Sequence, residues 1–391
     1  MDHQTWVEYL LRFSHLVAGI AWVGSSFYFI WLDASFEPPT EPRRNVEGEL
    51  FMVHGGFYYQ VEKRKIFPGE LPKTLHWFKW EATLTWLTGL TLFVVLYWLR
   101  GASLLVDPAV RTLTQGEAIG LSVAILVTAW VVYDLIWHPK WMSGKSALSL
   151  VLSALSFTGL VYGLTRVFSG RGAFIMTGAA LGTAMLLNVW MRILPGQRKM
   201  LREAEAGQIP DGSMSGRSKT RSVHNTYFTF PVLFIMLSNH YPVFYSHRWN
   251  WLLLMVLALS GAMIRHAMVA KRPRERWVLA PAAFGLLGLV FVTGARPAEP
   301  TSTSTEKVEL VEILRILEKR CWACHSSKPT DEVFKVAPSG IIFESETQLR
   351  ARADRIKLHV VTAKSMPLGN KTQMTDEERR VFGRWLEQPA P

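Results

Sequence analysis

The chain has 391 residues, of which 49% are hydrophobic and 16 are tryptophan, and its formal net charge is +12. The apolar residues form long runs up to about residue 294 and then stop, a pattern that excludes an ordinary soluble protein. Most basic residues lie between these runs, where membrane topology accounts for them, so the charge does not indicate nucleic-acid binding. We therefore expect membrane lipid as a partner and no nucleic acid.

Eight apolar runs are long enough to cross a bilayer, since a hydrocarbon core of about 30 Å needs about 20 residues of helix. The sixth run is expected to be interrupted by Pro231 and to end at Pro242, whereas segment 51–60 is too short to span and is expected to be interfacial or folded back among the helices. The fold class predicted is all-α, a polytopic membrane helix bundle of about eight spans. The expected spans are 13–32, 80–99, 117–137, 147–168, 173–194, 223–240, 249–270 and 277–294.

The loops between these spans differ in charge between the two faces of the membrane. Nineteen Lys and Arg residues fall in the loops on one face, and four fall in the loops on the other. The basic face is expected to be cytoplasmic, so both termini are expected outside the bacterial cytoplasmic membrane, on the periplasmic side. The basic loops are 33–79, 138–146, 195–222 and 271–276, and the others are 100–116, 169–172 and 241–248. No cleavable signal peptide is evident.

Composition divides the chain into three parts. Residues 1–294 are the membrane domain, and 295–307 (ARPAEPTSTSTEK) are rich in Pro, Ser and Thr and are predicted to be a linker. Residues 308–391 are expected to be a small globular domain in the external compartment.

The only two cysteines stand in this last part, in the sequence Cys321-Trp-Ala-Cys324-His325. C-x-x-C-H is the attachment signature of a c-type haem: two thiols bind the two vinyl groups and the following imidazole ligates the iron. A zinc site would need a second pair of ligands, which His359 alone does not supply, and a thiol redox pair would need a βαβ context. One covalent haem c is therefore the predicted cofactor, attached outside the cytoplasmic membrane as the charge count also requires.

The sixth iron ligand is expected downstream, and its candidates are Met366, Met374 and His359. We favour Met366, because KSMPLGN is an irregular loop that can deliver a thioether across the haem. Thr375 then resembles the N-cap of a last helix, which gives the layout of a class I-like cytochrome c with Trp385 packed on the first helix. Either methionine could instead be core packing. Methionine ligation would raise the haem potential.

Ionisable residues near the spans are the other candidates for chemistry, since they are costly in a membrane. Any single histidine there can be an interfacial or hydrogen-bonded residue, but seven together also suggest haem b in the membrane domain, with Gly19 leaving room beside His15. Four arginines are expected at helix ends. They either anchor the membrane topology or bind an anionic, carbonyl-rich substrate through their planar guanidinium groups. These arginines are Arg171, Arg192, Arg221 and Arg265. The seven histidines are His15, His54, His76, His138, His224, His240 and His266.

Several long stretches together resemble the bacterial membrane-bound urate oxidase (urate hydroxylase) family with a C-terminal cytochrome c. The resemblance covers essentially the whole chain in the same order. The stretches that carry it are HLVAGIAWVGSSFYFIWLD (15–33), GELFMVHGGFYYQVEK (48–63), LPKTLHWFKWEATLTWLTG (71–89), NVWMRILPGQRKM (188–200) and SVHNTYFTFPVLFIMLSNHYP (222–242). The resemblance implies oxidation of urate to 5-hydroxyisourate in purine breakdown. The electrons would leave through haem c toward the respiratory chain, with a terminal oxidase or a soluble cytochrome c as acceptor.

The resemblance also supplies the tentative catalytic residues, because these fall in its motifs. Urate oxidation needs a base near neutral pKa and amide-like groups for the purine carbonyls, for which Asn225 or Gln197 would serve. The candidates are His54, His76, Glu81, His224, Asn225 and His240, with Asn239 and Tyr241 in the same motifs.

Two other functions stay open. The first is another membrane dehydrogenase or quinol oxidase that uses the same cytochrome as electron outlet. The second is a transporter or assembly factor with a redox-sensing tail, although no clear internal repeat is present.

Overall fold

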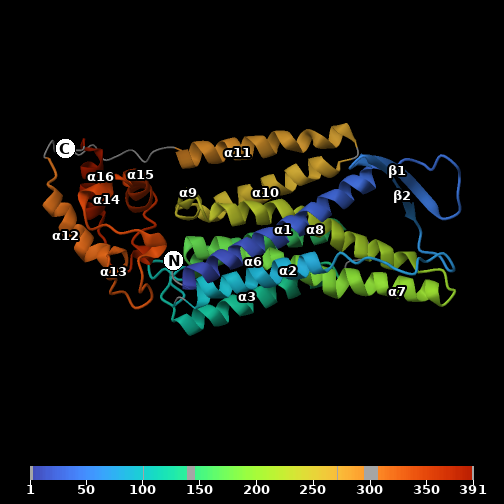
Figure 1. Ribbon diagram of the computed structural model, residues 1–391, viewed down its shortest axis with the longest axis horizontal. Coiled ribbons are helices and arrows are strands. Elements are labelled where there is room, and N and C mark those ends of the chain that lie inside the picture. Colours follow the sequence, from blue (N-terminus) through green and yellow to red (C-terminus); the bar gives the residue numbers. More distant parts are fainter. Residues whose placement is uncertain (1–2, 100, 139–145, 271, 295–306, 390–391) are drawn as a thin grey trace.

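The computed structural model describes residues 3–99, 101–138, 146–270, 272–294 and 307–389. Figure 1 shows a bundle of long helices with a two-stranded hairpin at one end and a small helical domain at the other. We call the end with the hairpin the inner end, and the end that carries the C-terminal domain the outer end. The predicted linker 295–307 falls outside the described residues except for Lys307.

Long helices run between these two ends, some of them extended by a π-helical or 3-10 turn. In chain order the helical elements of the bundle are α1 (His3–Ser35), α2 (Trp80–Phe93), η1 (Val94–Trp98), α3 (Gln115–Ile136), α5 (Ser146–Val167), α6 (Gly170–Asn188), η2 (Val189–Ile193), α7 (Leu194–Glu205), α8 (Gly212–Ser238), α9 (Pro242–Tyr245), α10 (Asn250–Val269), η3 (Pro273–Val278) and α11 (Leu279–Gly294).

Seven helices among the described residues are long and apolar enough to cross a membrane, and they match seven of the eight predicted spans. The other prediction, 223–240, lies in α8, which is not among the seven because polar and charged residues fill its first half. Pro231 does not interrupt α8 as predicted, since the helix continues through it to Ser238 and Pro242 begins α9 instead. Packing against a neighbouring helix allows a proline inside a membrane helix.

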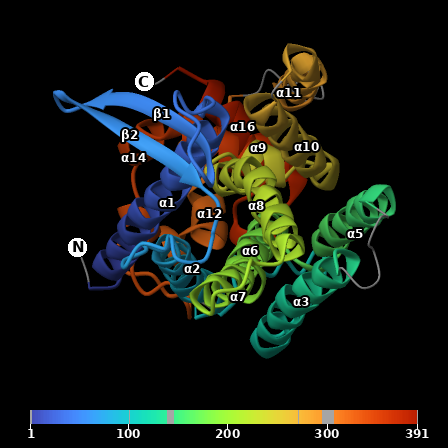
Figure 2. The same ribbon diagram turned by 90° about the vertical axis from the view of Figure 1, so that its right-hand side faces the viewer.

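The mostly helical fold agrees with the all-α prediction, and residues 46–64 are an exception to it, because they form an antiparallel hairpin of β1 (Val46–His54) and β2 (Phe57–Arg64). The segment 51–60 is therefore not folded among the helices. Gly55 and Gly56 both have positive φ, +61° and +82°, which a tight two-residue hairpin turn requires and which glycine adopts without strain. Figure 2 shows the hairpin reaching away from the bundle at the inner end.

Helix α6 lies at the centre of the bundle. The span that begins with α6 is 67% buried inside the protein, against 6% for α1, and α6 contacts α3, α5 and α8. Small residues on α6 allow this close approach: a Cβ built on Gly178 would lie 2.9 Å from Ile235 Cγ2 of α8. Helices α3 and α5 stand together beside this centre (Figure 2).

The C-terminal domain has a hydrophobic core of its own, in which Trp385 packs with Ile313 and Leu317 of the first helix, as predicted. The predicted N-cap is also confirmed: Thr375 Oγ1 accepts a bond of 3.2 Å from the Glu378 amide, which begins the last helix. The elements are α12 (Leu310–Arg320), α13 (Trp322–His325), η4 (Pro338–Gly340), α14 (Glu346–Arg350), α15 (Ala353–Ile356), η5 (Lys357–Thr362), η6 (Leu368–Asn370) and α16 (Asp376–Glu387).

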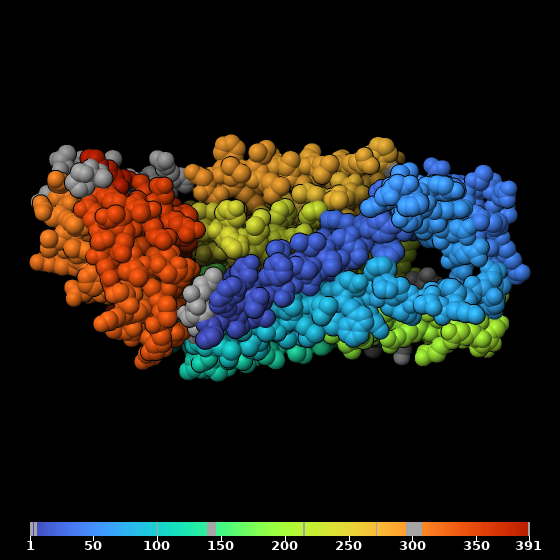
Figure 3. Space-filling model, in the orientation of Figure 1, coloured from blue at the N-terminus to red at the C-terminus, as the bar shows by residue number. Residues whose placement is uncertain are grey.

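This domain packs directly on the outer end of the bundle (Figure 3). Element η5 contacts α9, and a Cβ built on Gly369 would lie 3.4 Å from Pro108 Cδ. Gly101 is similarly close to Val333. The loop that follows Met366 is therefore held against the membrane domain.

The crossing of α8 and α10 predicts a stability difference between two glycine variants. A Cβ on Gly261 would lie 3.0 Å from the Pro231 nitrogen, whereas nothing lies within 4 Å of one on Gly288. Gly261→Ala should destabilise the protein in detergent by about 1–3 kcal/mol, because backbone atoms cannot give way. Gly288→Ala should be neutral or stabilising by up to about 1 kcal/mol. Thermal unfolding checks both, and an unchanged transition for Gly261→Ala would show that the helices do not cross this closely.

Candidate functional site

The cysteine motif forms one short helical turn at the end of α12. The His325 amide donates to the Cys321 carbonyl at 2.8 Å. The two cysteines and the histidine therefore follow one another around a single helical turn. His325 Nδ1 lies 2.9 Å from the Ile341 carbonyl oxygen. Because a carbonyl can only accept, Nδ1 carries the proton and Nε2 keeps the lone pair that a metal ligand needs.

The protonation of these groups disfavours the thiolate that a redox-active cysteine pair needs. Burial raises the pKa of Cys321 to about 12 and that of Cys324 to about 11, so both thiols are protonated at neutral pH. Burial also lowers the pKa of His325, which keeps its imidazole neutral. In the described ranges no group of three or more His, Cys, Asp or Glu residues is arranged to hold a metal ion, so a zinc site gains no support there.

The loop that carries Met366 is fixed by a buried arginine. Arg379 Nη1 donates to the carbonyl oxygens of Met366 and Val360, at 2.6 and 2.5 Å, and only 4% of Arg379 is exposed. Met374 is buried in the core of the domain, whereas Met366 is partly buried and packs against that core. His359 Nδ1 lies 2.9 Å from Ser365 Oγ, and this contact leaves its Nε2 unused. Because its loop is held in place by Arg379, Met366 stays the predicted sixth ligand.

These donors fit a c-type haem. The chain offers two thiols one turn apart, an imidazole with a free Nε2, and a thioether on a loop clamped from another helix. Cys321, Trp322, Phe343 and Met366 also pack against the apolar core, so the surroundings of the motif are hydrophobic.

A second group of polar residues lies within the bundle, toward the inner end, around Asp134 of α3. Arg192 Nε donates to Asp134 Oδ1 at 2.8 Å and Arg192 Nη2 donates to Oδ2. Arg221 Nη2 donates to Oδ1 at 2.9 Å, and its side chain is only 6% exposed. One carboxylate thus ties α3 to η2 and to α8 through two arginines.

A chain of neutral hydrogen bonds continues from this ion pair. Tyr133 Oη lies 2.8 Å from His224 Nδ1, and Asn188 Nδ2 donates to Tyr133 Oη at 2.9 Å. Asn188 Nδ2 also donates to Asn225 Oδ1 at 2.9 Å, and Asn225 Nδ2 donates to the Met185 carbonyl. Trp137 closes the group, with its ring centroid 4.2 Å from that of His224.

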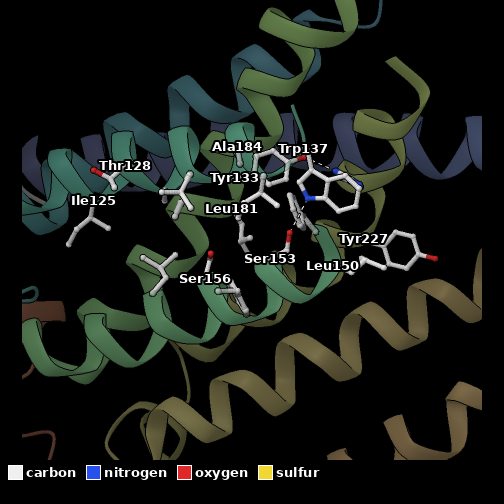
Figure 4. A pocket seen from close by; sticks show the side chains of 18 of the residues that line it. Ile125, Thr128, Tyr133, Trp137, Leu150, Ser153, Ser156, Leu181, Ala184 and Tyr227 are labelled. Carbon is white, nitrogen blue, oxygen red and sulfur yellow. Dashed lines mark hydrogen bonds between the residues drawn. The ribbon is translucent and has the colours of Figure 1, made fainter. Parts of the chain in front are cut away.

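This group borders a cavity of about 860 Å³ between α3, α5, α6 and α8. Figure 4 shows Tyr133 and Trp137 toward one end of the cavity and Ile125 and Thr128 toward the other, with Ser153 and Ser156 along α5. Its wall is largely apolar, with an imidazole, a phenol and an indole at one end. Such a cavity suits an apolar ligand.

The structure does not bring the six predicted catalytic residues together. His224 and Asn225 lie in the group just described. His54 is exposed at the hairpin turn and His76 is exposed beside Phe78, both at the inner end. His240 is exposed at the outer end, after α8.

Half-buried Glu81 and buried Arg265 are polar residues outside this group. Glu81 lies in the first turn of α2, and its Oε2 has no partner among the described residues. Arg265 is 1% exposed with its guanidinium over the Phe27 ring, and its Nε and Nη2 have no partner in the same ranges. Sequence analysis singled out Arg192 and Arg221 but placed them at helix ends, whereas both lie inside longer helical stretches. It missed Asp134, Tyr133 and Asn188. A lone aspartate inside an apolar run was the signal available for the first of these.

The ion pair predicts a large cost for removing its one carboxylate. Asp134→Asn leaves two guanidinium groups without an ionised partner, and one of them is buried. We expect a loss of about 3 kcal/mol in unfolding free energy, against a few tenths for the exposed Asp354→Asn, because a broken buried pair leaves an uncompensated charge. Thermal unfolding of both variants in detergent measures the difference, and equal transitions would contradict the buried pair.

Comparison with known proteins identifies the family of the membrane domain. Residues 2–295 match the family model described as urate oxidase N-terminal. Curated proteins and solved structures give no match. Since the matched region includes well over half of the 391 residues, the chain belongs to the urate oxidase N-terminal family.

Proposed function

We propose that this protein is a membrane-bound oxidoreductase that converts urate to 5-hydroxyisourate and releases the electrons through its C-terminal domain. The family match over residues 2–295, joined in one chain to the donor set of a c-type haem, carries the proposal. The reaction balances with one water: urate and water give 5-hydroxyisourate, two protons and two electrons. No hydrogen peroxide is formed, since oxygen is not the acceptor at the site.

The C-terminal domain would hold haem c through Cys321 and Cys324, with His325 and Met366 as iron ligands. That haem supplies a one-electron acceptor when bound. The chain's own residues set its surroundings: Ile341 orients the imidazole, Arg379 holds the Met366 loop, and the apolar core excludes water from this side.

The proposed setting is the bacterial cytoplasmic membrane, with the C-terminal domain on the periplasmic side. The hairpin and α7, which belong to two basic loops, lie at the end opposite to that domain (Figure 1), and this supports the charge argument. The electrons would pass to a terminal oxidase or a soluble cytochrome c.

Haem b in the membrane domain also stays a prediction. The His15 ring packs against Gly89, not Gly19: a Cβ on Gly89 would lie 2.7 Å from the ring. Its Nδ1 is engaged by Thr85 and Thr88, as that of His224 is by Tyr133.

One observation favours a second candidate, a quinol oxidase or related dehydrogenase. The cavity of about 860 Å³ beside Tyr133 and His224 is apolar and lies within the bundle, where a quinol would be found.

A spectroscopic experiment separates the two functions. Purified protein is oxidised without oxygen and mixed with urate, and the haem α-band is followed. The proposed function predicts reduction by urate but not by xanthine or allantoin. A haem that dithionite reduces and urate does not would refute it, and reduction by a quinol would then establish the second candidate.

A matched pair of methionine variants tests the assignment of Met366. Met366→Leu removes the thioether and should let carbon monoxide bind the reduced haem, because the sixth position is then open. Met374→Leu should leave carbon monoxide unbound and cost less than about 1.5 kcal/mol in stability, since the volume is conserved. Absorption spectra under carbon monoxide read out both variants, and the reverse pattern would make Met374 the ligand.

A further inference from the structure

A second cavity, of about 470 Å³, lies where the C-terminal domain meets the outer end of the bundle. One wall comes from the loop after η1, from the start of α6 and from the segment between α9 and α10. The other wall comes from residues 359–379, including Met366 itself. The cavity exists only because the two domains pack together.

Its lining mixes apolar and polar side chains and carries basic groups of both domains. Lys364 is paired with Asp376 at 2.6 Å, and Arg379 is used by backbone carbonyls. Asp107, the other acidic residue of the lining, accepts from the Ala109 amide within its own turn. The lining also includes Ser246, Asn250 and Asn370. Asn370 is used by Met374 and Arg379, and Asn250 Nδ2 donates to the Tyr245 carbonyl at 3.0 Å.

Arg171, in the first turn of α6, is the lining cation whose charge stays uncompensated. Its Nε donates to Asn239 Oδ1 at 3.3 Å, and its guanidinium also interacts with the hydroxyl of Tyr97. Both partners are neutral, and Arg171 has no carboxylate partner among the described residues. The positive end of the 19-residue helix α6 lies at the same place. A small anion in the cavity would therefore be attracted to this corner.

The cavity also lies beside the predicted iron ligand, whereas the cavity near His224 lies toward the other end of the bundle. A bilayer core is about 30 Å thick, which is too far for one efficient electron-transfer step. A substrate against the Met366 loop needs no intermediate cofactor to reach the haem.

We propose that urate binds in this interdomain cavity, with Arg171 as its main anion contact. The inference rests on the proposed function and specifies where that function takes place. Urate at neutral pH is a planar anion edged with carbonyl and N–H groups, and a guanidinium fork matches such an edge with two parallel hydrogen bonds.

The test measures binding rather than turnover. Full-length, haem-loaded protein is kept reduced with dithionite, so bound urate is not oxidised, and its Kd is determined by equilibrium dialysis. Arg171→Gln should raise the Kd at least tenfold, because hydrogen bonds to a charged group contribute about 1.5–3 kcal/mol. Arg248→Gln, at the same outer end but outside the cavity, should stay within twofold.

Ala109→Trp is a second test of the binding location. Ala109 is exposed and lines the cavity, so an indole at this position would fill the cavity. It should also raise the Kd at least tenfold, with haem content unchanged. Wild-type Kd values in both Arg171→Gln and Ala109→Trp would overturn the proposed location and leave the function standing. So would a loss of binding confined to His224→Gln. A wild-type protein that binds no urate would overturn the proposed function itself.

Discussion

The packing of the Met366 loop against the outer end of the helix bundle is the contact on which the functional account depends. Arg379 holds this loop from inside the C-terminal domain, and Gly369 brings its backbone against Pro108 of the membrane domain. Because the loop is shared, a ligand in the interdomain cavity would touch both the membrane domain and the predicted haem ligand. In the proposed function, the fusion of the two domains fixes the distance between substrate and electron acceptor.

The polar group around Asp134 has a different character. Charged residues in a membrane bundle are costly unless they are paired, and here one carboxylate serves Arg192 and Arg221. The bonds join α3, α6, η2 and α8, so the group stabilises the arrangement of helices around the larger cavity. The two cavities differ in chemistry as well as in place: the one within the bundle is largely apolar, and the one between the domains has a mixed lining that carries basic side chains. Urate matches the second, whereas a quinol would match the first.

The sequence predicted those parts of the structure that local patterns determine. Apolar runs located seven helices of span length, and Thr375 marked the start of the last helix. The hairpin was missed because residues 51–60 were read only as an apolar run too short to span a membrane, and the glycine pair at its turn was read only as part of a motif. Pro231 was read as an interruption because a single sequence does not show the neighbouring helix that packs against it.

The functional groups were harder to predict, since their contacts join residues far apart in the chain. Asp134 and Arg221 are separated by 87 positions, and Tyr133 and His224 by 91. Choosing catalytic candidates by motif therefore grouped His224 with His54 and His240, which lie at opposite ends of the bundle. Arg171 was singled out as a possible fork for an anion, but nothing local indicated that residues 359–379 would face it.

The most direct test of the account is the side of the membrane from which urate reaches the protein. The protein is reconstituted in sealed liposomes, and the fraction of outward-facing C-terminal domains is measured with a protease that cannot cross the bilayer. Urate is then added outside without oxygen, and the fast phase of haem reduction is recorded. The account predicts a fast amplitude equal to the outward-facing fraction, with the remainder reduced only after detergent is added. A fast amplitude equal to the inward-facing fraction would contradict it, because the substrate would then bind at the inner end.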